Sequence, residues 1–372
     1  MTFFDVIVVG AGPAGAVSAL KCAKQGYNTL LLERERLPRH KPCGGIIPIL
    51  CADLLEEEFG LKIPPEVMCS PKVLGLFYVP PSGRKNSGSL KNYRLFNINR
   101  DLFDQWLCRV AEGSGVQVLY GAEFLEFQKS EVIKVLVKDR ENMIELKSRY
   151  LIGADGVFSK VRKQLYPDLE WKTLTVLQEY WRAKGDFDEY FYAFFKEDIT
   201  PYYAYLIPKN GFFVIGTGVP RGYPISIPRC LNRFKKWLRQ EFAFEPVALE
   251  RKEIGAIPYH SLCNGEGNVI LVGDAAGFCN PFSGEGIRLA IESGIAASEA
   301  MKQAEHSGGL LSSLYARRIE GLKEFICRVY EFSIALTDKE REKFVTSELK
   351  RVSLGTTLGG ASPDEGCLPP TL

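Results

Sequence analysis

The sequence predicts an α/β protein with a parallel-sheet domain, an inserted antiparallel sheet and a helical C-terminal extension. Three observations predict this fold class. The apolar residues 3–9 lead into a glycine-rich turn, a helix and a second apolar strand, which together form a βαβ unit. Residues 166–257 are rich in aromatic residues in alternating patterns, which is typical of an antiparallel sheet. Strand, turn and helix then return in residues 268–287, so chain on both sides of the second domain completes the first.

The remaining elements follow from local pattern. Helices are expected at residues 16–25 and 49–59 and from residue 100 onward, because apolar residues recur there at helical spacing. Strands are expected at residues 28–33, 116–119 and 150–153 and on both sides of a turn at residues 80–83. These elements predict a first domain of residues 1–75, 96–165 and 258–330, a sheet domain of residues 76–95 and 166–257, and an extension of residues 331–372.

Composition excludes several classes of protein. The 372 residues are 46% hydrophobic and 25% charged with a net charge of +2, unlike a disordered, collagen-like or broadly nucleic-acid-binding chain. Ten cysteines without a CxxC pair, beside three histidines, predict no metal site, no disulfide framework and a reducing compartment. No apolar run approaches the ~20 residues that span a membrane. We therefore expect a cytoplasmic protein, with peripheral contact at the inner face of the membrane left open.

The first turn carries a dinucleotide-binding pattern. Gly10 permits the tight turn, Gly12 lets a pyrophosphate approach the backbone, and Gly15 lets the helix pack on the strand. The following helix N-terminus offers amide donors to the phosphates, and Glu33 at the end of the next strand suits a ribose. Glycines used only for turns are the weaker interpretation. The pattern predicts a Rossmann-like site that also includes the neighbouring Ala14 and Arg34.

A second pattern near the other end of the chain indicates which dinucleotide binds. Asp274 at a strand end is placed to accept a hydrogen bond from a polyol chain, and the loop after it leads into another helix. Nicotinamide cofactors lack a ribityl chain, whereas FAD has one, and a helix N-terminus stabilises the negative charge of a reduced flavin. The alternative is an ordinary turn capped by Asp274. The residues expected at FAD are Gly273, Asp274, Pro281, Gly284, Gly286 and Ile287.

The order of these motifs resembles a known family. Arg100 precedes a helix and Gly153-Ala154-Asp155-Gly156 ends a strand; taken alone, they are a solvated helix start and a turn. With the two glycine motifs they resemble, over roughly residues 3–300, the FAD-dependent family that includes para-hydroxybenzoate hydroxylase. The resemblance implies a FAD-binding domain in which Arg100, Asp155, Gly156 and Asp274 lie along the extended cofactor.

One stretch resembles a narrower family. Pro42-Cys43-Gly44-Gly45 matches the PCGG motif of the geranylgeranyl reductase family, flavoenzymes that reduce carbon–carbon double bonds in isoprenoid chains. A second signature of that family, close to PxxYxWxFP, is partly present at residues 201–208, with Tyr205 in place of tryptophan and Ile207 in place of phenylalanine. This departure concerns the substrate more than the reaction type. The resemblance implies Cys43, Gly44, Gly45, Tyr203 and Tyr205 as active-site residues, the first three also facing the flavin.

The chemistry of Cys43 has two interpretations. Two glycines after it let the backbone lie close to a flat ring, and the thiol is then placed to give a proton to the reduced carbon. The other interpretation is a small buried hydrophobe, which suits the remaining cysteines. The aromatic sheet has the same ambiguity, because Tyr190, Tyr192 and Phe194 suit either a prenyl tunnel or plain sheet core.

The helical segment of residues 229–239 also has two interpretations. It has an apolar face and five basic residues, which fits contact with an anionic membrane or, as we favour, packing on its own sheet. Residues 338–343 are expected to form a solvated helical face, and the Gly/Pro-rich end from Gly355 an ordered cap or a loose tail.

The sequence therefore predicts a FAD-dependent reductase that saturates double bonds of a prenylated small molecule or lipid by hydride transfer, with NADPH or ferredoxin as possible electron donors. It predicts no metal and no nucleic-acid partner. Two alternatives remain. One is a monooxygenase or halogenase on the same fold, although the halogenase pattern WxWxIP has lost both tryptophans here. The other is a flavin-containing lipid- or quinone-binding protein without turnover.

Overall fold

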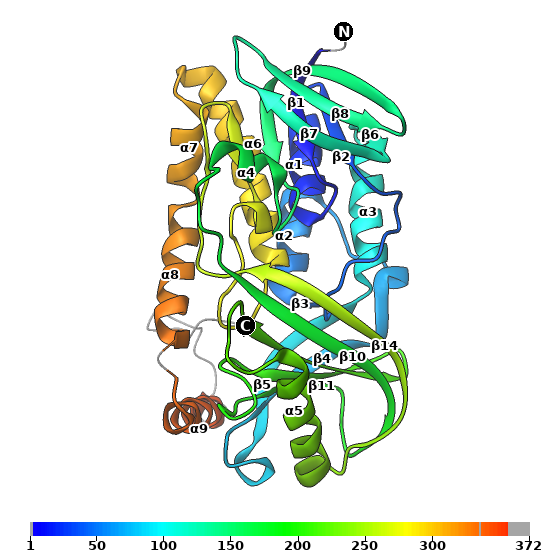
Figure 1. The fold of residues 1–372 in the computed structure, drawn as a ribbon, viewed down its shortest axis with the longest axis vertical. Helices are drawn as coiled ribbons and strands as arrows, with labels where there is room; N and C mark the ends of the chain where they lie inside the picture. The colour runs from blue at the N-terminus through cyan, green and yellow to red at the C-terminus, as the bar shows by residue number, and fades with distance from the viewer. Residues whose placement is uncertain (1–2, 335, 356–372) are drawn as a thin grey trace. The chain divides into compact units, whose positions relative to one another are not determined.

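The computed structural model describes residues 3–334 and 336–355. The chain divides into two compact units, each built on its own sheet (Figure 1). Unit 1 comprises Met1–Lys41, Arg100–Thr173 and Ile257–Arg328, and unit 2 comprises Pro42–Asn99, Leu174–Ala256 and Val329–Leu372. The α/β class with a second sheet and C-terminal helices is confirmed.

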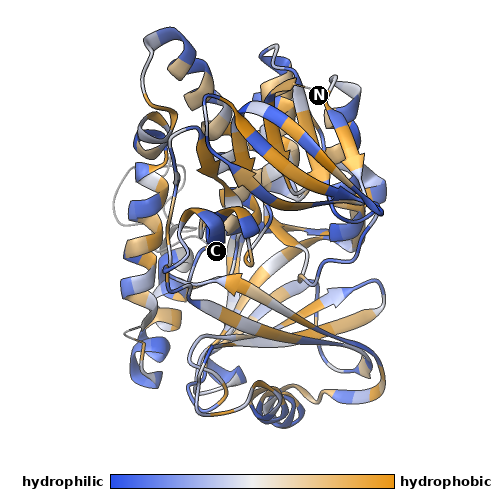
Figure 2. Cartoon of the chain, turned by 45° about the horizontal axis from the view of Figure 1, so that its top comes forward, coloured by the Kyte–Doolittle hydropathy of each residue, from blue (hydrophilic) through white to orange (hydrophobic). Residues whose placement is uncertain are grey.

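Unit 1 has a central parallel sheet in the order β16-β9-β1-β2-β6, which β15 extends at one edge. All five residues of β2 are buried, as expected for a parallel strand covered on both faces. Figure 2 shows the apolar residues gathered on the strands of this sheet. The carboxyl ends of its parallel strands meet at one edge. The strands are β1 (Phe3–Val9), β2 (Thr29–Glu33), β6 (Gln117–Tyr120), β9 (Asn142–Gly153), β15 (Gly265–Glu266) and β16 (Val269–Leu271).

Helices and an antiparallel extension complete unit 1. α1 packs against α3 and α6. β7 pairs with β8, and β8 pairs with the first half of β9. The sequence analysis did not predict this antiparallel meander. In β8, Ile133, Val135 and Val137 are buried and alternate with the less buried Lys134 and Leu136. The elements are α1 (Pro13–Lys24), α3 (Arg100–Gly113), β7 (Ala122–Gln128), β8 (Ile133–Asp139), α4 (Lys160–Leu165), α6 (Ile287–Ser307), α7 (Leu311–Arg318) and α8 (Glu320–Ile334), whose end passes into unit 2.

Unit 2 has a mostly antiparallel sheet in the order β14-β10-β13-β12-β11-β4-β5-β3. It takes residues 42–75, which the sequence analysis assigned to the first domain, because β4 pairs with β5 and β11. The elements are β3 (Ile46–Pro48), α2 (Ile49–Phe59), β4 (Met68–Val79), β5 (Gly88–Ile98), β10 (Thr173–Lys184), β11 (Tyr190–Phe194), β12 (Ala204–Lys209), β13 (Phe212–Pro220), α5 (Ile227–Phe242), β14 (Glu245–Pro258) and α9 (Asp338–Gly355).

One face of this sheet packs on α5. Leu231, Phe234 and Leu238 of the helix are buried in one cluster with Tyr192 and Phe194 of β11. The apolar face of α5 is therefore covered by its own sheet, as the favoured interpretation held. Tyr192 and Phe194 are sheet core, which corrects the tunnel interpretation for both, and Tyr190 packs against the same cluster.

The C-terminal helix is more deeply embedded than expected. Arg341 of α9 is only 2% exposed, and its guanidinium donates to the carbonyl oxygens of Leu336, Thr200 and Pro201. The predicted solvated face at residues 338–343 is therefore wrong at this position. The tail beyond Gly355 lies outside the described residues. Among the helices that the structure describes, none is both long and apolar enough to cross a membrane.

Candidate functional site

The β1–α1 turn of unit 1 requires glycine at two positions. Gly10 has φ +100°, and a Cβ added there would lie 2.5 Å from the carbonyl oxygen of Ala154. A Cβ on Gly15 would lie 1.8 Å from the carbonyl oxygen of Gly10. Only a hydrogen fits in either place. The turn is thereby held against the end of β9, and α1 packs closely on β1.

The N-terminus of α1 is open. Gly12 is its N-cap and no side chain caps the helix, whose first turn contains Pro13 and no acidic residue. The nearest atom to a Cβ built on Gly12 is Nη2 of Arg39, at 3.9 Å. Backbone N–H groups in the first turn of a helix have no partner within the helix. They and the helix dipole form a binding place for an anion such as a pyrophosphate.

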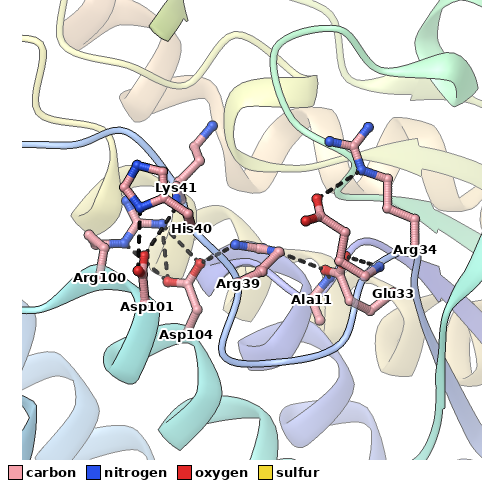
Figure 3. Close-up of polar contacts among 10 residues, drawn as sticks. Ala11, Glu33, Arg34, Arg39, His40, Lys41, Arg100, Asp101 and Asp104 are labelled. Carbon is pink, nitrogen blue, oxygen red and sulfur yellow. Dashed lines mark hydrogen bonds and ion pairs between the residues drawn. The ribbon is translucent and has the colours of Figure 1, made fainter. Parts of the chain in front are cut away.

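Glu33 closes the second strand and holds the neighbouring backbone (Figure 3). Its Oε2 accepts from the Ala11 N–H at 3.0 Å and its Oε1 from the Glu35 N–H at 3.0 Å. Arg39 Nε donates to Oε2 at 3.2 Å. A carboxylate has about four acceptor positions, so the two oxygens retain capacity for a ribose hydroxyl.

A row of alternating charges extends from Glu33 (Figure 3). Arg39 also donates to Asp104 Oδ2 at 3.1 Å, and Arg100 donates to both oxygens of Asp104 at 3.1 Å. Burial lowers the pKa of Arg39, but Asp104 and Glu33 outweigh it and raise the pKa. The Arg100 side chain is 9% exposed, so it is not the solvated helix start of the simpler interpretation. Sequence reasoning missed Arg39, which lies in an irregular segment without a motif.

The two carboxylate oxygens of Asp155 have different surroundings. Its Oδ2 accepts from the Lys160 and Val161 N–H groups at 2.6 and 3.3 Å, so it caps α4. Its Oδ1 is buried and has no hydrogen-bond partner within the described chain. Burial raises the pKa of Asp155. A buried oxygen of this kind fits a ligand donor, and Gly156, with φ +78°, leaves open space beside it.

The second predicted motif reaches the first. A Cβ on Gly273 would lie 2.8 Å from the Cβ of Ala14, which places the β16 turn directly on the first turn of α1. Arg162 links two turns, because it donates to the carbonyl oxygens of Ala275 at 3.0 Å and Val157 at 2.8 Å. No sequence signal distinguished Arg162. Motifs more than 250 residues apart in the sequence thus form one surface of unit 1.

The loop before α6 is tightly ordered. Asn280 accepts from the N–H groups of Phe282 and Ser283 at 3.0 and 3.1 Å and, through its backbone oxygen, from Gly284 at 2.8 Å. α6 begins at Ile287 with Gly286 as its N-cap, and the carboxylate of the preceding Glu285 accepts from the Arg288 N–H at 2.7 Å. Asp274 Oδ1 lies 3.4 Å from the Cβ position of Gly286. The N-terminus of α6 is therefore partly capped by Glu285, with the Asp274 carboxylate beside it and the buried Pro281 in the loop.

Next to Glu33 lies a surface hollow of about 370 Å³. Arg34 lines it, and its exposed guanidinium pairs with Glu35 at 3.4 Å. The volume falls within the range of roughly 300–1,000 Å³ that small-molecule sites occupy. The other lining residues are Gly121, Glu123, Lys138 and Arg140.

The Cys43 loop belongs to unit 2. Gly45 has φ +68°, donates its N–H to Cys43 Sγ at 3.3 Å and accepts from the Ile98 N–H at 2.7 Å. A Cβ on Gly45 would lie 2.2 Å from the Ile98 carbonyl oxygen, and one on Gly44 would lie 3.0 Å from Ile207 Cδ1. The partly exposed Cys43 is therefore held at a loop packed on β5 and β12.

The sheet face that carries this loop is the one opposite α5. Along β12, Tyr205, Ile207 and Lys209 alternate with residues of the α5 core. The ring of Phe191 stacks on Tyr205 at 6.1 Å and meets Tyr203 at 6.2 Å. Burial raises the pKa of Tyr205. The structure thus gathers Tyr203 and Tyr205 on one aromatic surface, to which Phe191 adds a residue that sequence reasoning missed.

A polar network begins at the end of this surface. The Tyr205 hydroxyl donates to Gln178 Oε1 at 2.8 Å, and the Gln178 amide donates to Glu253. Arg251 Nε donates to the other oxygen of Glu253 at 2.7 Å. Gln178 and Glu253 are buried. Sequence reasoning missed all three, because they come from β10 and β14 without a recognisable motif.

Comparison with known proteins identifies the family. Residues 4–309 match the FAD binding domain family. Protein CbrA of Escherichia coli strain HS is 28% identical over 315 residues, covering 82% of this chain and 84% of CbrA. A geranylgeranyl bacteriochlorophyll reductase-like protein of Thermoplasma acidophilum has a TM-score of 0.78 at 22% identity, covering 93% of this chain and 91% of that one. The flavin-dependent halogenase CmlS has a TM-score of 0.68 at 17% identity, covering 95% of this chain and 70% of that one.

The geometry of unit 1 fits a flavin dinucleotide. The open N-terminus of α1 suits its pyrophosphate, Glu33 suits the ribose, and the orphaned Oδ1 of Asp155 suits a further donor. The structural neighbours include both a reductase-like protein and a halogenase, so the fold does not distinguish reaction types. The chain belongs to the FAD binding domain family, and FAD is its cofactor.

Proposed function

We propose that this flavoprotein is a reductase that saturates carbon–carbon double bonds in an isoprenoid chain of the geranylgeranyl type. The observation that carries the proposal is the Cys43-Gly44-Gly45 loop. It presents a partly exposed thiol on the sheet face that also carries Tyr203 and Tyr205. The likeness in fold to a protein described as geranylgeranyl bacteriochlorophyll reductase-like supports it.

Each part of the chain has a defined task in this reaction. Bound FAD in its reduced form supplies the hydride equivalent. Cys43 supplies the proton that the second carbon requires. The Gly45 N–H, 3.3 Å from Sγ, stays in place when the proton leaves and stabilises the thiolate. Gly44 and Gly45 carry no side chain, which suits the close approach of a flat ring.

The sheet face also suits an amphipathic substrate. Its aromatic part, formed by Phe191, Tyr203 and Tyr205, offers apolar surface to a prenyl chain. The buried Gln178 amide is hydrogen-bonded to the Tyr205 hydroxyl and to the Glu253 carboxylate. These polar groups next to the aromatic surface suit a polar head group. A prenyl chain attached to a lipid, quinone or pigment precursor combines both properties. NADPH and ferredoxin are the electron donors to be tested.

The direct experiment presents a panel of prenyl lipids to the purified protein reduced with dithionite, under anaerobic conditions. We expect at least one product that is heavier by two hydrogens per bond reduced. Substrate-dependent oxygen uptake in air, with a hydroxylated or halogenated product, would instead establish the monooxygenase or halogenase alternative. Bound prenyl lipid that keeps its mass under every reductant would establish the binding protein without turnover.

The Cys43→Ala variant tests the proton donor. We expect it to retain FAD and to lose turnover by about 100-fold, in the range that general acid catalysis contributes. Cys327→Ala is the matched control, because Cys327 is also partly exposed but belongs to α8 in unit 1. Full activity of Cys43→Ala would remove the thiol from the reaction.

A further inference from the structure

Lys209 is a buried cation whose presence requires an explanation. It is the last residue of β12 and is only 7% exposed. Its Nζ donates to the Ile98 carbonyl oxygen at 2.8 Å and to Cys69 Sγ at 3.6 Å. Within the described chain it forms no ion pair with a carboxylate. An unpaired buried ammonium is costly, so its retention indicates a use for the charge.

The ammonium lies against the Cys43 loop. A Cβ built on Gly45 would be 2.7 Å from Lys209 Nζ, and Gly45 is the residue whose N–H donates to Cys43 Sγ. Burial lowers the pKa of Lys209, and the nearby thiols of Cys69 and Cys43 oppose that effect. Lys209 and Cys43 are thus within electrostatic reach of each other.

The other ionisable groups around this pair come from four strands. Cys69 is on β4, Tyr180 on β10, and Tyr205 on β12, while Arg251 and Glu253 are on β14. Glu253 neutralises the only other cation among them, because Arg251 Nε donates to it at 2.7 Å, and the guanidinium also lies 3.5 Å above the Tyr180 ring. Lys209 is the cation of this group that no described carboxylate pairs.

We propose that Lys209 is a positioning residue for Cys43, whose thiolate its ammonium stabilises after the thiol has given its proton to the substrate carbon. This inference rests on the proposed function for its chemistry. In the step, the S–H bond of Cys43 breaks, its proton forms a C–H bond, and the electron pair remains on sulfur. The other C–H bond forms from the hydride that the reduced cofactor provides, and solvent returns a proton to sulfur.

The test measures the rate at which iodoacetamide alkylates Cys43 as a function of pH, with mass spectrometry of the peptide that contains it. The thiolate is the reacting form. In the Lys209→Gln holoprotein, which keeps an N–H donor for Ile98, we expect the rate at neutral pH to fall about tenfold. The plateau rate at alkaline pH should not change. Lys209→Arg, which keeps the charge, should retain the wild-type profile.

Lys236→Gln is the matched control, because it removes the same charge from an exposed position on α5. An unchanged Cys43 profile in Lys209→Gln would overturn the inference. A second measurement uses the wild-type protein and does not depend on the stability of any variant. A neighbouring ammonium favours an anionic reagent. The ratio of the alkylation rate with iodoacetate to the rate with iodoacetamide should therefore be higher for Cys43 than for glutathione. A ratio equal to that of glutathione would also contradict the inference.

The alkylation profile separates this inference from the proposed function. If Lys209→Gln shifts the profile but no prenyl lipid is reduced, the stabilisation of the Cys43 thiolate by Lys209 stands and the reaction assignment fails. If prenyl lipids are reduced while the profile is unchanged, the reaction stands and the role of Lys209 fails.

Discussion

Both units of this flavoprotein use glycines to bring backbone into close contact, but they surround those glycines with different charges. In unit 1, Glu33 and Asp104 beside the nucleotide turn are paired with Arg39 and Arg100. In unit 2, the Gly45 loop lies against Lys209, which no described carboxylate pairs. Paired charges hold a geometry, whereas an unpaired charge raises the energy of the resting state and is available to a reacting group. The comparison separates the predicted FAD-binding residues of unit 1 from the residues of the proposed proton transfer, which lie in unit 2.

The substitution with the largest expected effect disrupts the β1–α1 turn. Gly15→Ala places a methyl group 1.8 Å from the Gly10 carbonyl oxygen, so either β1 or α1 has to move. We expect FAD content to fall at least about tenfold, because the pyrophosphate cradle depends on this close packing. The measurement is flavin absorbance per protein after gel filtration.

Gly113→Ala is the control for that variant, because a Cβ at this position of α3 meets no atom within 4 Å. It should keep its FAD. A Gly15→Ala protein with full FAD content would show that the turn tolerates a side chain and would weaken the assignment of unit 1.

The next effect removes one member of the charged row. Arg39→Met leaves the buried carboxylates of Glu33 and Asp104 without this partner, which should cost about 3 kcal/mol of unfolding free energy. Urea unfolding measures it. Arg34→Met is the control, because the Arg34 guanidinium is exposed and, among the described residues, pairs only with Glu35. This variant should change stability by less than about 0.5 kcal/mol. Equal effects of the two variants would contradict the role of Arg39 as the link between Glu33 and Asp104.

The smallest expected effect concerns a thiol that is buried and neutral. Cys22 of α1 is fully buried, and burial raises its pKa to about 12. Because the folded pKa is above the unfolded value, its contribution to stability is complete below pH 9 and is lost as pH rises toward 12. Between pH 8 and pH 10, wild-type unfolding free energy should therefore fall by about 1 kcal/mol more than that of Cys22→Ala. Identical losses in urea unfolding would contradict the buried, neutral thiol.

Sequence reasoning succeeded where the structure depends on local pattern. Gly10, Gly15 and Gly273 were identified because a tight turn or close approach needs glycine wherever it occurs, and periodicity predicted the parallel strands. It failed where a partner comes from a distant segment. Arg39 meets Asp104 across 65 positions, and Lys209 meets Ile98 across 111, and neither residue belongs to a motif. A charged residue in sequence looks solvated until the fold shows what surrounds it.

The same limit explains the boundary of the second domain and the aromatic residues. Residues 68–75 were assigned to the first domain, yet β4, to which they belong, finds its partners in β5 and β11. Tyr192 and Phe194 were possible tunnel residues, but strand alternation turns them toward α5, and Phe191 of the same strand faces Tyr203 and Tyr205. Which face of β11 is covered depends on where α5 packs, and the sequence of β11 alone does not predict that.

Anaerobic single turnover tests the central claim most directly. The protein is reduced with one equivalent of dithionite and mixed with prenyl lipid while oxygen is excluded, and flavin absorbance and product mass are followed together. The account predicts that oxidised-flavin absorbance returns without oxygen and that one double bond is saturated for each FAD reoxidised. Absorbance that returns only when oxygen is admitted, with every double bond intact, would contradict it.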